Sequence, residues 1–395
     1  MKRIIPWLVL PLIAIVGMRA YFLMTPAQKV AADAPAARAA HNPGVQVAVA
    51  QAPVAKTSVA NASVAAVPSG KNWSHWRGPE ENGVSRERDL PLKWSDKLDG
   101  LGENVLWKSP YGTRSTPIVQ NGRVYIVNDV DSGINEQERI CCLDAKSGKL
   151  LWERRFNVFL VDIVSSRVGW TSMAGDPETG YVYCHGTQGY ITCLDKDGKQ
   201  IWQRSLTEEV GRFCGYGGRL SSPVVDGDLV MTGIINANYG DQAKGANRFF
   251  AFDKRTGQTV WWADTHEKVN DTYYSTPIVA NIAGERLLIC GGGDGFLDAF
   301  KVRTGEVAWN FPVSVKAINS SPVVWGNKVY IGNGEENADD PSIQGQVVCV
   351  DGADVKDHHP KLVWKADAIR AAFGSPTIYD GKLYMPEESG KLFCF

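Results

Sequence analysis

The sequence predicts an all-β fold, a β-propeller made of four-stranded antiparallel blades. Three observations carry this prediction. The 395 residues include 40 glycines and 20 prolines, a composition typical of many short strands joined by tight turns. A motif that ends in tryptophan recurs along the chain, and a second motif built on Ser/Thr-Pro precedes its copies. No amphipathic stretch of helical length separates the predicted strands, which argues against a parallel βαβ array.

The tryptophan motif supplies the outer half of each blade. The segment "LDAKSGKLLW" at 143–152 recurs at 194–202, 252–261 and 300–309, with a looser copy at 350–364. Its tryptophans are 48 to 59 residues apart, which matches one four-stranded unit of a propeller. We expect the third strand of a blade (C) to end near the aspartate. A C–D turn at the glycine and an outermost strand (D) with the tryptophan should follow.

The Ser/Thr-Pro motif supplies the inner strands A and B. It occurs at 115–127, 221–233, 275–290, 320–332 and 374–386, and in a degenerate form at 171–184. Asn-Gly and Asp-Gly pairs within the copies indicate hairpin turns. Six blades are therefore visible, and the sixth ends after its third strand. Either the segment Val105–Trp107 supplies the missing outer strand and closes a six-bladed ring, or the sixth blade is incomplete and a full-length chain holds seven or eight.

The N-terminal residues predict export. Lys2 and Arg3 precede an apolar run that reaches Met24, so residues 1–24 form a signal peptide or an uncleaved signal anchor. We favour the anchor, with its basic end in the cytoplasm. Residues 25–70, rich in Ala, Val and Pro, are expected to form a disordered linker, and 71–395 the propeller. The chain is then periplasmic or otherwise extracytoplasmic, held at the inner membrane by residues 4–24.

The repeated Asp-x-x-Ser/Thr-Gly-x-x-x-Trp signature resembles the blade repeat of pyrroloquinoline-quinone (PQQ) propellers. That family includes quinoprotein dehydrogenases and the propeller lipoprotein of outer-membrane barrel assembly. The opening "NWSHWRGPEENGVS" (72–85), followed by "NVLWKSP" (104–110), is similar to the start of exported PQQ-like propellers. The resemblance covers residues 72–395. It implies a WD40-like ring, but the Ca²⁺ ligands, Asp base, stacking Trp and loop cysteine pair of the enzymes have no residue-by-residue match here.

Adjacent cysteines, Cys141 and Cys142, raise the question of a redox pair. Aligned repeats place a small residue at the Cys142 position of every blade and a bulky apolar residue at the next position, as expected where blades pack face to face. Neighbouring side chains in a strand point to opposite faces, and a vicinal disulfide would break that strand. We therefore interpret Cys142 as a small buried hydrophobic residue and not as part of a redox device.

The periodic tryptophans have a structural interpretation. They share one position in the outer strand, so each is expected to dock on the turn of the adjacent blade. The set comprises Trp107, Trp152, Trp202, Trp261, Trp309 and Trp364.

A second column of residues begins each innermost strand and is expected to face the mouth of the central channel. It mixes cationic, aromatic and amide groups, a mixture that can bind an anionic or planar ligand or merely line a wet channel. The candidate residues are Arg114, Trp170, Arg219, Tyr274, Asn319 and Phe373.

Long B–C connections are predicted around the same mouth, in blades 1, 3 and 5. They span 128–139, 233–247 and 332–346, and long loops on a rigid scaffold often collect binding residues. The first and third are acidic. We interpret their carboxylates as solvated surface charge, because the Ca²⁺-loop pattern is incomplete.

The function predicted is a non-catalytic binding or scaffold module of the cell envelope. A net charge of −1 gives no basic surface for nucleic acid, and the six histidines show no metal-ligand spacing. The partner is expected to be an envelope protein or small ligand at the B–C loop face, and no cofactor is assigned. Two alternatives remain. One is a PQQ- and Ca²⁺-dependent quinoprotein oxidoreductase with diverged or missing ligands, and the other is the sensory domain of a larger envelope protein.

Overall fold

A computed structural model describes residues 72–94, 102–112, 114–158, 168–211, 221–236, 246–265, 269 and 274–395. The chain divides into the units Met1–Ala65 and Ala66–Phe395, and every described residue belongs to the second. The predicted signal segment and linker lie outside the described residues. Across the described ranges, no helix has both the length and the apolar character needed to cross a membrane.

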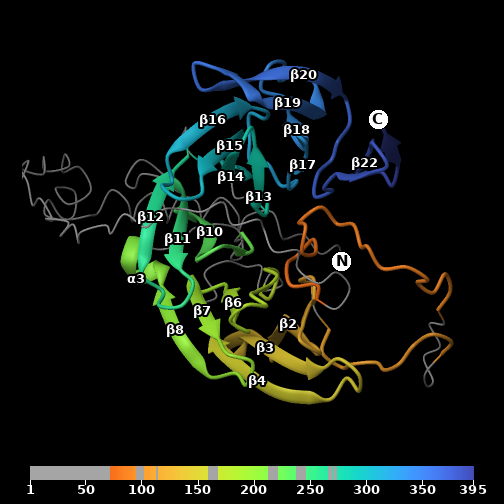
Figure 1. Cartoon of the computed structure of the whole chain (residues 1–395), viewed down its shortest axis with the longest axis vertical. Helices are drawn as coiled ribbons and strands as arrows, with labels where there is room; N and C mark the ends of the chain where they lie inside the picture. The colour runs from red at the N-terminus through yellow and green to blue at the C-terminus, as the bar shows by residue number, and fades with distance from the viewer. Residues whose placement is uncertain are drawn as a thin grey trace, which may run out of the picture. The chain divides into compact units, whose positions relative to one another are not determined.

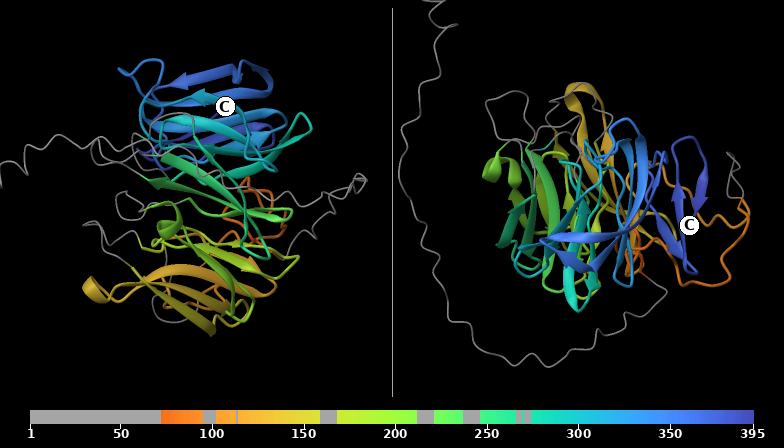
Figure 2. Two further views of the ribbon diagram at one scale, coloured as in Figure 1. Left: turned by 90° about the vertical axis from the view of Figure 1, so that its left-hand side faces the viewer. Right: turned by 90° about the horizontal axis from the view of Figure 1, so that it is seen from above.

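The described chain forms six antiparallel sheets in sequence order, as the repeats predict. Figure 1 shows these blades following one another from yellow through green to dark blue, and Figure 2 shows the same succession from two further sides. Five sheets have four strands and the sixth has three.

Blade 1 consists of β1 (Ile118–Gln120), β2 (Arg123–Val130), β3 (Gln137–Asp144) and β4 (Leu150–Asn157). Blade 2 consists of β5 (Ala174–Gly175), β6 (Val182–His185), β7 (Tyr190–Leu194) and β8 (Gln200–Ser205). Blade 3 consists of β9 (Val224–Asp226), β10 (Leu229–Asn236), β11 (Ala246–Asp253) and β12 (Thr259–Asp264). Blade 4 consists of β13 (Ile278–Ile282), β14 (Glu285–Gly291), β15 (Phe296–Lys301) and β16 (Val307–Pro312). Blade 5 consists of β17 (Val323–Trp325), β18 (Lys328–Glu336), β19 (Gln344–Lys356) and β20 (His359–Asp367). The described strands of blade 6 are β21 (Thr377–Tyr379), β22 (Lys382–Pro386) and β23 (Leu392–Cys394). Two short helical turns are η1 (Gly133–Asn135) and α3 (Leu206–Val210).

The repeated Asp and Gly of the tryptophan motif build the C–D turn. In blade 1, Asp144 Oδ1 accepts hydrogen bonds from the N–H and hydroxyl of Ser147 at 2.8 and 2.7 Å. Gly148 follows with φ +69°, the left-handed conformation that glycine adopts without a steric cost. Blade 3 repeats the arrangement with Asp253 and Thr256. The motif therefore encodes a turn closed by its own side chains.

The hydrophobic core is a series of layers between consecutive blades. Ile118 and Cys142 of blade 1 pack with Met173 and Val182 of blade 2, and equivalent clusters join blades 2 and 3, 3 and 4, 4 and 5, and 5 and 6. The small-then-large pairs of strand C in blades 2 to 5 contribute to these layers on both sides, as expected for blades packed face to face. The residues at the centre of the ring therefore lie outside these core clusters.

The predicted long B–C loops are partly strand, so the loops themselves are shorter than predicted. In blade 1, β2 continues to Val130 and β3 resumes at Gln137, so only the tip of the insertion leaves the sheet. In blade 5, β18 and β19 pair as far as Glu336 and Gln344. An insertion split between two paired strands extends the hairpin, because both strands keep their hydrogen-bond partners. The tip of the blade 3 insertion, residues 237–245, lies outside the described residues.

The sixth blade has three described strands. The edge of its sheet is β23, which pairs with β22 alone among the described strands. The segment Val105–Trp107, predicted as one possible closing outer strand, forms no strand pairing within the described ranges. Trp107 nevertheless reaches blade 1, where its Nε1–H donates to the carbonyl of Ala145 at 2.9 Å.

Candidate functional site

The starts of the innermost strands converge on a cavity of about 190 Å³, called the mouth cavity below. All six blades contribute to it. Its lining consists of Trp76, Arg114, Ser115, Thr116, Trp170, Ser172, Ser222, Tyr274, Thr276, Asn319, Ser321, Phe373 and Ser375. Five of the six predicted mouth residues are therefore brought together. The sixth, Arg219, lies outside the described residues.

Aromatic rings form one continuous group in the mouth cavity. The rings of Trp170 and Tyr274 stack with centroids 5.2 Å apart, and Phe373 meets Tyr274 edge-on at 5.4 Å. The guanidinium of Arg114 lies 5.7 Å from the Trp170 ring centroid, within range of a cation–π interaction. Phe373 is 64% exposed. The group thus offers apolar area with one cation at its edge, a composition common at the centres of protein interfaces.

Hydroxyl groups form a belt beneath these rings. In several blades the Ser or Thr that precedes the proline position donates its backbone N–H to the equivalent hydroxyl of the next blade. The described links are Thr116 to Ser172 (2.9 Å), Ser172 to Ser222 (2.9 Å), Thr276 to Ser321 (2.8 Å) and Ser321 to Ser375 (2.9 Å). Sequence reasoning missed this belt, although the repeated Ser/Thr was its signal. These hydroxyls hold the ring together, so the aromatic and charged side chains carry the binding potential of the cavity.

Residues 72–84, called the N-terminal plug below, lie inside the ring near its A–B turns. Trp73 forms a β-bridge with Val119 through two N–H···O=C bonds of 2.7 and 2.8 Å. The side-chain oxygen of Asn72 accepts a 2.9 Å bond from the N–H of Asn121 in the first A–B turn. Figure 1 shows the start of this segment, in orange, near the middle of the ring. The plug therefore enters the channel from the end opposite the mouth.

Arg77 fixes the middle of the plug. Its side chain is 7% exposed and donates to the carbonyl of Asn82 (3.2 Å), the hydroxyl of Thr377 (2.8 Å) and the carbonyls of Pro322 (3.4 Å) and Pro376. Burial lowers the pKa of Arg77 to about 10, which leaves the group charged at neutral pH. A guanidinium that donates to several oxygens from different segments fixes those segments relative to one another.

Two titratable residues of the plug face each other. Oε2 of Glu81 accepts a 2.8 Å bond from the N–H of Val279, and its Oε1 lies 3.4 Å from Nδ1 of His75. Burial raises the pKa of Glu81 to about 8 and lowers the pKa of His75 to about 4. Both groups are therefore mainly neutral at pH 7. The sequence offered residues 72–85 as a family marker only, and nothing in a local pattern places these side chains inside the ring.

The periodic tryptophans lie between blades, away from the mouth cavity. Four of them donate their indole N–H to a carbonyl in the turn of the following blade: Trp107 to Ala145 (2.9 Å), Trp152 to Lys196 (2.8 Å), Trp202 to Lys254 (3.1 Å) and Trp261 to Val302 (2.7 Å). Trp309 is 1% exposed and lies beside Gly352. Trp364 stacks on Phe395 at 5.3 Å.

The adjacent cysteines point away from each other. Cys142 packs in the layer between blades 1 and 2, whereas Cys141 packs with Ile126, Leu143 and the nearby Trp107. Both thiols are free and fully buried. Burial raises the pKa of each to about 11, so neither carries the thiolate that redox exchange needs at neutral pH.

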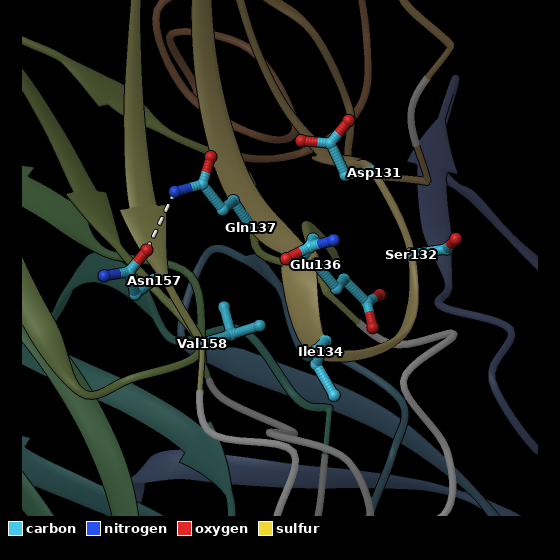
Figure 3. Close-up of a pocket in the computed structure, with 8 residues that line it drawn as sticks. Asp131, Ser132, Ile134, Glu136, Gln137, Asn157 and Val158 are labelled. Atoms are coloured by element: carbon cyan, nitrogen blue, oxygen red, sulfur yellow. Dashed lines mark hydrogen bonds between the residues drawn. The ribbon is translucent and has the colours of Figure 1, made fainter.

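A second, polar cavity of about 650 Å³ surrounds the tip of the blade 1 hairpin. Figure 3 shows Asp131, Ile134, Glu136, Gln137 and Asn157 around it, with a 2.8 Å hydrogen bond from Gln137 to Asn157. Ile134 is 97% exposed. The cavity is open and lined mainly by groups already used in the hairpin, so it ranks behind the mouth cavity as a binding site.

The acidic hairpins do not form a Ca²⁺ site among the described residues. Asp131 lies 3.7 Å from Arg155, and Glu336 lies 3.3 Å from Lys316. Asp339 pairs with Lys365. Nowhere in the described ranges do three His, Cys, Asp or Glu side chains gather as metal ligands. The described lining of the mouth cavity includes Arg114 and no carboxylate, so it does not fit the oxygen donor set of a PQQ-associated Ca²⁺ ion.

The antiparallel blades, each with a C–D turn and with tryptophans docked between them, define a PQQ-like β-propeller. The family model described as outer membrane protein assembly factor BamB (PQQ_2) matches residues 164–395. The chain belongs to this family.

Curated relatives of two kinds are similar to the chain. BamB of Burkholderia pseudomallei is 26% identical over 58% of this chain and 50% of its own length. The quinoprotein ethanol dehydrogenase of Pseudomonas aeruginosa is 24% identical over 45% of this chain and 28% of its own. The chain thus spans half or less of the length of these relatives.

Two solved structures are also similar to the chain. BamB from Moraxella catarrhalis has a TM-score of 0.40 at 16% identity, covering 70% of this chain and 78% of that one. A quinohemoprotein alcohol dehydrogenase from Pseudomonas putida has 0.48 at 15% identity, covering 72% and 57%.

Proposed function

We propose that the chain is a non-catalytic binding or scaffold module of the cell envelope, and that an envelope protein docks on its B–C face with the mouth cavity at the centre. The observation that carries this proposal is the aromatic group of half-buried Trp170 and Tyr274 and exposed Phe373, with Arg114 at its edge. Aromatic and arginine side chains dominate binding energy when they sit at the centre of an interface. Membership of a family described as an outer membrane assembly factor supports the choice of a protein partner.

Envelope location is part of this proposal. The basic start and apolar run of residues 1–24 support export with an anchor over 4–24. If the full chain is expressed in a Gram-negative host, it should fractionate with the inner membrane and resist alkaline extraction. Release of the whole chain into the soluble periplasmic fraction would contradict the anchor and favour a cleaved signal peptide.

Site-specific photo-crosslinking in cells tests the docking surface. A benzophenone amino acid is placed at Phe373 in one strain and at Trp325 in another. Trp325 is a matched control, since it is 55% exposed and lies at an A–B turn on the opposite face. We expect one discrete protein adduct from position 373 alone, identified by mass spectrometry. Arg114→Glu and Tyr274→Ala should each weaken the adduct about tenfold, as for a hot-spot residue. No adduct, or equal adducts at both positions, would reject the proposal.

A quinoprotein oxidoreductase is the competing function, and its support is the similarity to quinoprotein dehydrogenases. Titration of the purified chain with PQQ, with and without Ca²⁺, would separate the two functions through quenching of tryptophan fluorescence. We expect no saturable quenching. Ca²⁺-dependent saturation in the micromolar range would favour the oxidoreductase instead.

A further inference from the structure

The N-terminal plug reaches into the mouth cavity from the far end of the channel. Trp76 is the member of the plug that lines the cavity, beside residues that begin the innermost strands. Three residues earlier, Trp73 pairs with Val119 in the innermost strand of blade 1, and Asn72 contacts the A–B turn that follows it. The plug therefore spans the channel, and the docking surface is built from the plug as well as from the blades.

The plug is tied to blades that are not neighbours in the ring. The carbonyl of Ser74 accepts a 2.7 Å bond from the N–H of Gly175 in blade 2. Glu81 accepts the N–H of Val279 in blade 4. Contacts this far apart around a ring fix both the depth and the rotation of a short segment, because no single blade can move it alone.

Arg77 connects this anchoring to Trp76. Its guanidinium lies 5.6 Å from the Trp76 ring centroid, close enough for a cation–π interaction. The same guanidinium is bonded to carbonyl and hydroxyl oxygens of blades 5 and 6 through Pro322, Pro376 and Thr377. The position of the Trp76 ring is thus set by the bonds that its neighbour makes to the blades.

We propose that Arg77 is a positioning residue of the docking site, which holds Trp76 as the floor of the mouth cavity so that the partner contacts the plug. This inference rests on the proposed docking function. It adds a specificity determinant that lies outside the repeats. The partner segment would be one that places an apolar side chain against Trp76, Tyr274 and Phe373, with an acidic group near Arg114, since Arg114 is the cation of the described lining.

The experiment uses the full-length chain with the crosslinker at position 373, and compares three variants. Trp76→Ala removes the floor, Arg77→Met removes the guanidinium, and Arg86→Met is the matched control, because Arg86 is an exposed arginine of the adjoining segment. Fluorine NMR of 5-fluorotryptophan-labelled protein reports on the tryptophans one by one, and Trp76→Ala assigns the Trp76 signal. We expect Arg77→Met to shift that signal while the signals of the interblade tryptophans stay in place. Crosslinking should fall about tenfold in both plug variants and stay unchanged in the control.

The outcomes separate the two proposals. If the wild-type chain gives no adduct at position 373, the docking function itself fails. If it gives the adduct and Trp76→Ala leaves the yield unchanged, the docking function stands and the role of the plug is rejected. A shifted Trp76 signal in Arg77→Met with undiminished crosslinking also rejects it. Displacement of all tryptophan signals in Arg77→Met would assign Arg77 a general structural role and overturn the positioning role.

Discussion

Two side chains of the N-terminal plug couple its packing to pH. Glu81 and His75 lie 3.4 Å apart inside the ring, with Arg77, Asp226 and Arg286 around Glu81 and Asp176 and Asp226 around His75. Burial is the largest cause of both pKa shifts, and it disfavours the charged form of each group. Between its two pKa values, Glu81 is protonated in the folded chain and ionised in the unfolded chain. His75 behaves in the opposite way, since between its two pKa values it is neutral in the folded chain and protonated in the unfolded chain.

These shifts give opposite dependences of stability on pH. The contribution of Glu81 is fully present below its ordinary pKa of 4.5 and is lost as the pH rises toward its folded-state pKa of about 8. The contribution of His75 is lost as the pH falls from 6.5 toward about 4. Between about pH 4.5 and pH 6.5 the two effects on stability oppose each other. Above pH 6.5 the effect of Glu81 remains, so stability falls as the pH rises toward about 8.

Glu81→Gln should remove the alkaline loss. The amide keeps the acceptor for the Val279 N–H but cannot ionise. We expect the melting temperature of the variant relative to the wild type to rise by roughly 2–5 °C between about pH 6 and pH 9, from the size of the pKa shift and the usual enthalpy of a chain this long. Thermal unfolding followed by circular dichroism measures it. Glu80→Gln, an exposed neighbour, is the control. A parallel response of both variants would show that Glu81 is solvated.

The paired cysteines should be inert in the folded chain. Iodoacetamide near pH 8 is expected to alkylate the exposed Cys394 and to leave Cys141 and Cys142 unmodified, because their buried thiols hold little thiolate. Peptide mapping by mass spectrometry resolves these positions. After unfolding in denaturant, both should become reactive. A peptide recovered with Cys141 joined to Cys142 would contradict the packing described for the two side chains.

At the scale of the element, each of the first four blades is held to the next by an indole ring packed on a glycine. Gly257 has φ +73°, and a Cβ there would lie 2.6 Å from Cδ2 of Trp202. Gly122 has nearly the same backbone, φ +74°, but a Cβ there would meet no atom within 4 Å. The two glycines therefore share a conformational requirement and differ in whether a tryptophan covers them.

Comparison of Gly257→Ala with Gly122→Ala isolates the contribution of tryptophan docking to the free energy of unfolding. Both variants should lose about 1–2 kcal/mol from the left-handed conformation. Gly257→Ala should lose roughly 1–3 kcal/mol more, since overpacking displaces the Trp202 ring. The midpoint of urea unfolding gives both values. Equal losses would mean that the indole ring moves aside freely and that docking contributes little to stability.

Elements that repeat could be predicted from the sequence, and elements that do not repeat could not. The column of Arg114, Trp170, Tyr274, Asn319 and Phe373 was found because every blade places it at the same position of an innermost strand. The N-terminal plug has no copy elsewhere in the chain. Its bonds join Arg77 to residues 245 and 299 positions away, a separation at which local patterns carry no information. The extended hairpins of blades 1 and 5 lack the apolar alternation of a strand, so the sequence predicts loops there.

At the scale of the whole molecule, the blades are unequal in their protection from solvent. The strand β15 of blade 4 lies between two partners and is buried over four consecutive residues. The strand β23 of blade 6 is an edge strand whose three residues are at least partly exposed. In a chain of units that contact mainly their neighbours, a unit whose described strands are partly exposed should open before one whose strands are buried.

Hydrogen exchange should therefore proceed unevenly around the ring. We expect amides of β21–β23 to exchange at least about tenfold faster than those of β14 and β15, since local opening of an edge sheet needs less free energy than opening of a buried one. Mass spectrometry of peptic peptides from the full chain, sampled from seconds to a day, resolves the two regions. Peptides of the N-terminal plug should exchange at an intermediate rate, because Arg77 ties the plug to blade 6 while Glu81 ties it to blade 4. Equal protection of blades 4 and 6 would instead mean that the ring opens as one cooperative unit, in which the three-stranded sheet is stabilised as well as the complete ones.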